Sequence, residues 1–283
     1  FQRHIAHQGE TALDLAEKAC HTLIPDAGAE FADIDGLIFC TETPDHPIPS
    51  NACLLHGRLG LPQNVLSLDI NMGCSAKKVC NKAAGSALMK NEKLVEDIIK
   101  SVVNAVNIPV TLKMRTGWNE ENKNAPTIAK IAEDNGIKML AIHGRTRSQK
   151  YNGDAEYDTV KKIKGIVSIP VVANGDITSA EKAKKVLDYT GADAVMLGRA
   201  TQGNPWLVGQ INNYITTGKT SKAPSLDKKI SLILGHILQI HDFYGHKMGT
   251  QLSRKHIFWY SMHLDQKKGT AFWPSINRVS DHS

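Results

Sequence analysis

The sequence contains no long hydrophobic run, few cysteines and no metal-binding motif. No stretch approaches the roughly 18 consecutive apolar residues of a membrane-spanning helix, so we expect no membrane partner. The twelve histidines lack HExxH spacing, and we therefore expect no metal. The cysteines are odd in number and lack CxxC spacing, which predicts a reducing, cytoplasmic protein without a zinc site: Cys20, Cys40, Cys53, Cys74 and Cys80. The sequence begins with Phe1 rather than Met and shows no charged-then-apolar signal peptide, so we expect a truncated or processed start.

Basic residues are scarce in the first quarter of the chain and abundant afterwards. Residues 1–68 hold three basic and nine acidic residues, whereas residues 69–283 hold 31 basic and 19 acidic ones. The net charge of +6 therefore combines a segment of −6 with one of +12. Such a shift indicates two segments with different partners. The basic segment fits either a polyanion-binding surface or a lysine-rich solvated one.

The first segment alternates helix, strand and proline-rich loop. Thr11 is expected to cap a helix that runs to Leu23 and is ended by Pro25. The remaining elements are a strand over 36–40, an extended loop over 41–50, a helix from 50 or 51 to 59, and a buried strand over 65–70.

From residue 91 the pattern becomes a regular alternation of helices and strands. The helix at 91–106 is expected to bury one face, that of Leu94, Ile98, Val102 and Val106. Further helices are predicted at 127–134, 157–164 and 179–189, and strands at 109–113, 139–143, 169–173 and 194–197. Such βα units imply a parallel sheet, either a barrel or a doubly wound sheet.

The strands stop at Ser225, after a linker at 216–224. Two helices are predicted beyond it, at 226–244 and 254–260. We therefore predict three domains, comprising residues 1–68, 69–215 and 225–283, the last of them all-helical.

Cys74 follows the strand at 65–70 on a turn. The turn formers are Asn71, Gly73 and Ser75. Lys77 and Lys78 come directly behind the cysteine, and nearby lysines lower the pKa of a thiol and attract phosphate. The carboxyl ends of strands are where α/β proteins usually build their chemistry. Cys74 is therefore our candidate catalytic residue.

Polar motifs also follow four later strands. They are Lys113, the run from His143 to Arg147, Asn174-Gly175-Asp176, and Gly198-Arg199. A lone lysine at such a place is more often an ion-pair partner. Four motifs at one end of consecutive strands favour a (β/α)8 barrel and a phosphate-bearing cofactor, and flavin mononucleotide (FMN) fits.

Seven motifs lie from Asp69 onward: Asp69-Ile-Asn-Met-Gly-Cys74, Val110-Thr-Leu-Lys113, Arg115-Thr-Gly-Trp118, Ile142-His-Gly-Arg-Thr-Arg147, Ala173-Asn-Gly-Asp-Ile-Thr178, Gly198-Arg-Ala200 and Arg254-Lys-His256. Through these motifs and others, about three quarters of the chain resembles the B-type bacterial tRNA-dihydrouridine synthases. The resemblance implies a TIM barrel with tightly bound FMN that reduces uridine in tRNA to dihydrouridine, using NADPH.

The resemblance also implies roles for individual residues. Cys74 would be the general acid that protonates C5 of uracil after hydride reaches C6. The flavin contacts would be Lys113, His143, Asn174, Gly175, Asp176, Gly198 and Arg199. We expect tRNA to contact basic residues, namely Lys77, Lys78, Arg145, Arg147, Arg254 and Lys255. Trp259 and Tyr260 lie among basic residues and fit either RNA contact or packing. We expect a monomer.

Residues 1–70 depart from that family and resemble ketoacyl synthase III, which has the thiolase fold. The motifs are Glu10-Thr-Ala-Leu-Asp-Leu-Ala16, Ala32-Asp-Ile-Asp-Gly-Leu-Ile38 and Thr43-Pro-Asp-His-Pro-Ile-Pro-Ser50. The Pro-Met-Ala-Gly flavin turn of the dihydrouridine synthases is missing. Ser75 stands where the dihydrouridine synthases have proline. Only five barrel strands follow from Asp69, and eight are needed. We therefore predict a barrel incomplete at its N-terminal strands, through fusion or an assembly error rather than natural divergence.

Two other functions stay open at this point. One is a ketoacyl synthase-like acyltransferase with Cys74 as its nucleophile, although that family's later histidine and asparagine motifs are not recognisable. The other is a non-catalytic tRNA-binding remnant, which predicts salt-dependent tRNA affinity without flavin or turnover.

Overall fold

A computed structural model describes residues 12–26, 30, 58–59 and 67–279. The strand predicted at 36–40, the loop at 41–50 and most of the helix at 50–59 lie outside these residues. The chain divides into two compact units. We call residues 5–175 with 186–196 the sheet unit, and residues 1–4, 176–185 and 197–283 the helical unit. The three domain boundaries derived from the sequence stay predictions.

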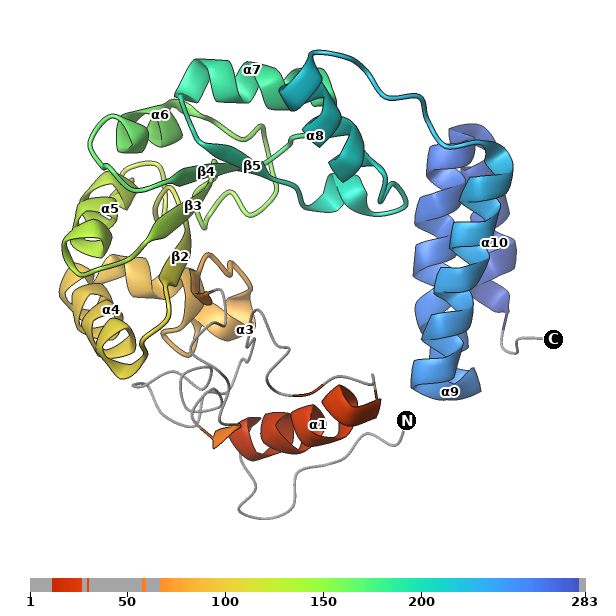
Figure 1. The fold of residues 1–283 in the computed structure, drawn as a ribbon, viewed down its shortest axis with the longest axis horizontal. Helices are drawn as coiled ribbons and strands as arrows, with labels where there is room; N and C mark the ends of the chain where they lie inside the picture. The colour runs from red at the N-terminus through yellow and green to blue at the C-terminus, as the bar shows by residue number, and fades with distance from the viewer. Residues whose placement is uncertain (1–11, 27–29, 31–57, 60–66, 280–283) are drawn as a thin grey trace. The chain divides into compact units, whose positions relative to one another are not determined.

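The sheet unit contains a five-stranded parallel sheet in the order β1-β2-β3-β4-β5 (Figure 1). Its strands are β1 (Leu68–Met72), β2 (Val110–Arg115), β3 (Met139–His143), β4 (Val171–Asn174) and β5 (Ala194–Met196). Each strand pairs with the next one along the chain, and the register sets Asn71 opposite Lys113 and His143 opposite Asn174. Because all five strands run parallel, their carboxyl ends share one edge.

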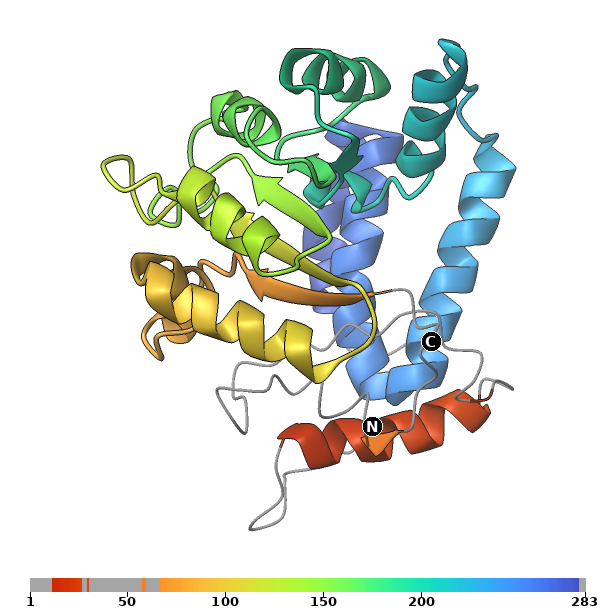
Figure 2. The same cartoon turned by 60° about the vertical axis from the view of Figure 1, so that its left-hand side comes forward.

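The connecting helices decide between a barrel and a doubly wound sheet. They are α4 (Glu92–Ala105), α5 (Ala125–Asp134) and α6 (Asp158–Lys164), preceded by the short α3 (Lys77–Cys80) and the 3₁₀-helix η2 (Gly85–Lys90). Figures 1 and 2 show α4, α5 and α6 on the same side of the sheet. A doubly wound sheet carries helices on both faces and reverses its strand order. The prediction of a (β/α)8-type fold with a helical C-terminal region is therefore confirmed.

The core lies between this sheet and its helices. Leu112, Met114 and Leu140 are fully buried, as expected for strands covered on both faces. Helix α4 begins after Asn91, whose side-chain oxygen accepts a hydrogen bond from the Leu94 amide at 3.0 Å. The face predicted for α4 was right for Val102, which is buried, but wrong for Leu94, which is exposed. The residues that α4 buries are Val95, Ile99 and Val102.

Two other elements of the sheet unit differ from the prediction. Strand β2 continues two residues beyond Lys113, to Arg115, so Lys113 does not end its strand. Helix α1 spans Ala12–Asp26 and includes Pro25, which was expected to end it. Helix α7 (Ala180–Thr190) has residues in both units.

The helical unit contains the 3₁₀-helix η3 (Arg199–Thr201) and three longer helices. These are α8 (Leu207–Thr217), α9 (Leu226–Leu264) and α10 (Gln266–Arg278). Helix α9 covers both helices predicted beyond Ser225, and Gly245 interrupts it with a φ of 70° and a ψ of 172°. Helices α9 and α10 pack against each other. In the described part of the chain, no helix is long and apolar enough to cross a membrane.

Candidate active site

The backbone around Cys74 is held by hydrogen bonds from two directions. The Cys74 carbonyl accepts from the Ser86 amide at 2.9 Å and from Ser86 Oγ at 2.7 Å. The amide of Gly73 donates to Asn71 Oδ1 at 2.9 Å. Gly85 makes the close approach possible, because a Cβ there would lie 2.8 Å from the Cys74 oxygen. The Cys74 side chain is exposed, so a fixed backbone presents an accessible thiol.

Arg115 is the residue of this site that sequence reasoning missed. Its side chain is only 2% exposed, and its guanidinium makes four hydrogen bonds. Two of them reach the neighbours of Cys74, with Nε donating to the Gly73 carbonyl at 2.9 Å and Nη2 to Ser75 Oγ at 3.2 Å. Nη1 donates to the carbonyls of Thr146 and Lys150, both at 2.9 Å. Arg115 therefore ties the turn after β1 to the loop after β3.

The sequence did contain a signal for Arg115. Lys113 and Arg115 are two residues apart on β2, so both side chains project from the same face of the sheet. Two cations on one face of a strand flanked by apolar residues are expensive to bury without partners. This alternation pointed to a polar site along the strand as well as at its end.

Lys113 lies in an environment that disfavours its charge. Burial is the main cause that lowers the pKa of Lys113, the nearby Arg115 lowers it further, and Asp69 opposes both. Burial likewise raises the pKa of Asp69, although Thr111 Oγ1 donates a hydrogen bond of 2.7 Å to its carboxylate. Lys113 is thus a poorly hydrated cation that an electron-rich ring or an anion would stabilise.

His143, Asn174 and Gly175 meet at the same edge. His143 is 8% exposed, and Asn174 Nδ2 donates to the Met196 carbonyl at 2.8 Å. Gly175 has a φ of 121°, and a Cβ there would lie 2.7 Å from the Cβ of Ala155 and 3.0 Å from His143 Cδ2. Only glycine fits this position, so the backbone after β4 passes close to the imidazole ring.

Three predicted cofactor residues lie in the helical unit. Arg199 Nη2 forms an ion pair of 3.0 Å with Asp176 Oδ1, and Arg199 is about half exposed. Asp176 adopts a φ of 46°, which is unusual for a residue other than glycine. A Cβ built on Gly198 would have no neighbour within 4 Å, so the backbone before η3 is open on that side.

The residues predicted to contact RNA differ in their accessibility. Lys77 and Lys78 are exposed on α3. Arg145 is not the exposed cation that we expected, because it is 2% exposed and its Nη2 donates to the Gly153 carbonyl at 2.6 Å. Burial without such hydrogen bonds would be costly, which explains why the guanidinium turns inward. Arg147 is half-buried, with its guanidinium 4.5 Å from the centre of the Trp118 ring.

In the helical unit, Lys255 is exposed, and its Nζ lies 4.6 Å from the centre of the Trp259 ring. Arg254 Nε donates to the Val279 carbonyl at 2.9 Å, so this guanidinium anchors the segment after α10. Tyr260 is 6% exposed, and its hydroxyl lies 3.0 Å from His236 Nδ1. Of the two readings for Tyr260, packing fits this geometry.

Comparison with known proteins places the chain in a family. The dihydrouridine synthase (Dus) family model matches residues 57–283. The chain belongs to the dihydrouridine synthase family. It is 52% identical over 214 residues to tRNA-dihydrouridine synthase B of Pseudomonas aeruginosa, covering 76% of this chain and 64% of that one. For the enzymes of the same name from Pseudomonas putida and Vibrio cholerae, the identities are 57% and 51%, over 76% and 75% of this chain and 63% and 65% of theirs.

The matches cover only part of this chain and only part of each relative. The chain spans less than two thirds of the length of all three relatives named. The family match begins at residue 57, so it gives no support to the ketoacyl synthase resemblance of residues 1–68, which stays a prediction. Among solved structures, a nitroalkane oxidase from Streptomyces ansochromogenes has a TM-score of 0.33 at 16% identity, covering 66% of this chain and 45% of that one. That likeness is too weak to carry an argument.

Proposed function

We propose that this chain acts as a flavin-dependent tRNA-dihydrouridine synthase, which reduces uridine in tRNA to 5,6-dihydrouridine with NADPH as the reductant. The observation that carries the proposal is the exposed Cys74 thiol on a fixed turn, at the sheet edge that also holds Lys113, His143 and Gly175. Membership of the dihydrouridine synthase family supports the same reaction. We expect the protein to act as a cytoplasmic monomer.

The described residues fit FMN as the cofactor. In the sheet unit, Lys113 is a desolvated cation that lacks a carboxylate within ion-pairing distance among the described residues, and His143 lies beside the tight Gly175 backbone. In the helical unit, the open backbone at Gly198 and the half-exposed Arg199 suit a phosphate. Asn174 and Asp176 complete the proposed set. A bound flavin would supply the hydride that adds to C6 of uracil.

The role of the chain's own groups is to present a proton and to orient the base. The Cys74 thiol gives its proton to C5 and becomes a thiolate, while Ser86 and Arg115 keep its backbone in place. A target base must leave the tRNA stack to reach the thiol. The exposed Lys77 and Lys78 follow Cys74 by three and four residues, which supports a contact with the phosphates beside that base. Arg147, Arg254 and Lys255 are proposed as further tRNA contacts.

The test is the variant Cys74→Ala, measured by dihydrouridine formation in a tRNA transcript, by flavin absorbance and by tRNA affinity. Loss of the proton donor is expected to lower turnover by about 10²- to 10⁴-fold, with flavin content and affinity unchanged. Cys20→Ala, which removes a thiol on α1, is the matched control and should turn over normally. A Cys74→Ala protein with full turnover would refute the proton-donor role.

The same measurements, together with an assay for acyl transfer, separate the other two functions. An acyltransferase would transfer an acyl group from acyl-CoA to Cys74 of the wild-type protein, and nothing in the comparisons favours that activity. A tRNA-binding remnant would bind tRNA in a salt-dependent way, yet would be colourless and would not take up added FMN. Either result would replace the synthase as the function of this chain.

A further inference from the structure

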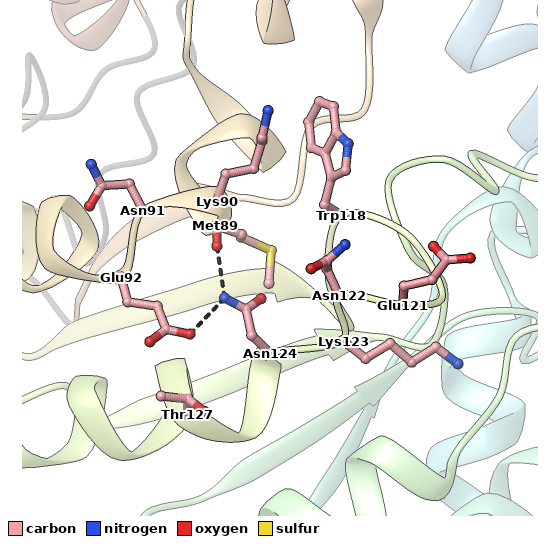
Figure 3. Close-up of a pocket in the computed structure, with 10 residues that line it drawn as sticks. All are labelled: Met89, Lys90, Asn91, Glu92, Trp118, Glu121, Asn122, Lys123, Asn124 and Thr127. Carbon is pink, nitrogen blue, oxygen red and sulfur yellow. Dashed lines mark hydrogen bonds between the residues drawn. The ribbon is translucent and has the colours of Figure 1, made fainter.

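A cavity of the sheet unit lies beside the segments that follow β1 and β2. It has a volume of about 740 Å³, which is within the range of small-molecule sites. Its walls come from the end of η2, the start of α4, the loop after β2 and the start of α5 (Figure 3). The lining residues are Met89, Lys90, Asn91, Glu92, Trp118, Glu121, Asn122, Lys123, Asn124 and Thr127.

This pocket is connected to the Cys74 turn through η2. Ser86, near the start of η2, donates two hydrogen bonds to the Cys74 carbonyl, and Lys90 at its end lines the pocket. At a rise of about 2 Å per residue, the four steps from Ser86 to Lys90 span about 8 Å. The pocket wall therefore begins on the order of 10 Å from the Cys74 backbone, a distance that a few nucleotide steps of about 3.4 Å each would span.

Lys90 lines this pocket together with Trp118, and its ammonium lies over the indole ring. Arg147 also lies over this ring but is not among the residues that line the pocket. Lys90 Nζ is 4.8 Å and the Arg147 guanidinium 4.5 Å from the centre of its ring. Lys90 has no carboxylate partner among the described residues, and Arg147 Nε is buried there without a hydrogen-bond partner. An indole ring attracts cations and restricts their side chains. The indole thus holds the unneutralised charge of Lys90 in place at the pocket, which suits a phosphate.

The rest of the lining is suited to a base rather than to an anion. Figure 3 shows Asn124 bound within the wall, where its Nδ2 donates to the Met89 carbonyl at 2.8 Å and to Glu92 at 2.9 Å. Lys123 is likewise engaged, by Glu120 at 2.7 Å. Glu121 is exposed at the pocket, and a carboxylate repels phosphate but accepts hydrogen bonds from the amino groups of bases.

We propose that this pocket binds a nucleotide of the tRNA that neighbours the uridine presented to Cys74. Lys90 binds its phosphate, and Glu121 accepts a hydrogen bond from an amino group of its base. This inference rests on the proposed function, since it places the pocket along the same RNA strand. It assigns the pocket to RNA contact and predicts a preference for an amino-bearing base at that position.

The test compares Lys90→Gln with Lys138→Gln in binding a tRNA transcript at several salt concentrations. Lys138 is an exposed lysine that precedes β3 at the opposite edge of the sheet, so its loss changes the net charge equally. Lys90→Gln should weaken binding by about 3- to 10-fold and reduce the slope of log affinity against log salt by about one, whereas Lys138→Gln should change neither. Equal effects of the two variants would overturn the proposal.

Glu121→Gln tests the base contact separately. It should weaken binding by a few fold if the carboxylate meets a base amino group. Stronger or unchanged binding would mean that no base is read there, and would overturn that half of the proposal. Measuring dihydrouridine formation by the wild-type protein distinguishes failure of the proposed synthase function from failure of the proposed pocket. A wild type without flavin or turnover refutes the synthase function, whereas an active wild type with an inert Lys90→Gln change refutes only the pocket.

Discussion

Replacing Arg115 by lysine should impair catalysis more than it impairs stability. Arg115 donates four hydrogen bonds from a side chain that is 2% exposed. A lysine ammonium cannot bridge acceptors on both sides of this fork, since it lacks the planar arrangement of donors. Hydrogen bonds to charged groups contribute about 1.5–3 kcal/mol each. If two are lost, the free energy of unfolding should fall by about 3 kcal/mol.

The effect on turnover follows from the two bonds that flank Cys74. Without them, the Gly73 carbonyl and the Ser75 hydroxyl lose the donor that fixes the turn. A displacement of about 1 Å at a reacting group can lower the rate by about 10²-fold. We therefore expect kcat for dihydrouridine formation to fall by about 100-fold while KM for tRNA changes little, since Arg115 is 2% exposed and its four hydrogen bonds are all made within the chain.

The matched control for this experiment is Arg145→Lys. Arg145 is equally buried, and its guanidinium donates to the carbonyls of Asn152 and Gly153 rather than to the Cys74 turn. It should lose comparable stability in a urea titration but retain most of its turnover. If Arg115→Lys keeps full kcat, or if Arg145→Lys loses as much, the positioning role of Arg115 is wrong.

Two further predictions concern stability. Glu133 accepts hydrogen bonds from Lys130 and Ser168, in that order of influence, and they lower its pKa to about 2. The stabilisation from this lowered pKa is fully present above pH 4.5 and is lost as the pH falls toward 2. In Glu133→Gln, the free energy of unfolding should therefore fall by about 1 kcal/mol less over that pH range than in the wild type. An equal fall in the two proteins in acid titrations would contradict this prediction. Gly245→Ala should destabilise by about 1–3 kcal/mol because of its φ of 70°, whereas Gly235→Ala, in open helix, should stabilise by about 0.5–1 kcal/mol, and thermal melts showing the reverse order would refute this account.

The strands and helices of the sheet unit were largely predictable because hydrophobic periodicity determines them. Strand β3 was predicted at its observed limits, and α6 and α7 within one residue. The buried face of α4 was predicted only for Val102, because an apolar residue at helical spacing fits more than one face until the packing partner is known. Helix α8 was not predicted. Helix α10 was not predicted either, and it contains Pro274, a residue that usually ends a helix.

The site was predictable to the extent that it lies at strand ends. Cys74, His143 and Asn174 could be placed because the carboxyl ends of parallel strands share an edge. Arg115 and the inward turn of Arg145 could not, because both depend on backbone carbonyls supplied by distant loops. Sequence spacing identifies a cation but does not show whether solvent or the chain itself provides its partners.

The strand order has a consequence for how this protein forms during synthesis. Each strand pairs with the one made just before it, so the sheet can grow in the order in which it leaves the ribosome. At about 5–20 residues per second, the stretch from β1 to β5 takes on the order of ten seconds to appear. Throughout that time, the newest strand offers an unpaired edge until its successor arrives. Slow translation or a stalled ribosome would therefore extend the period in which a partly built sheet can pair with other chains.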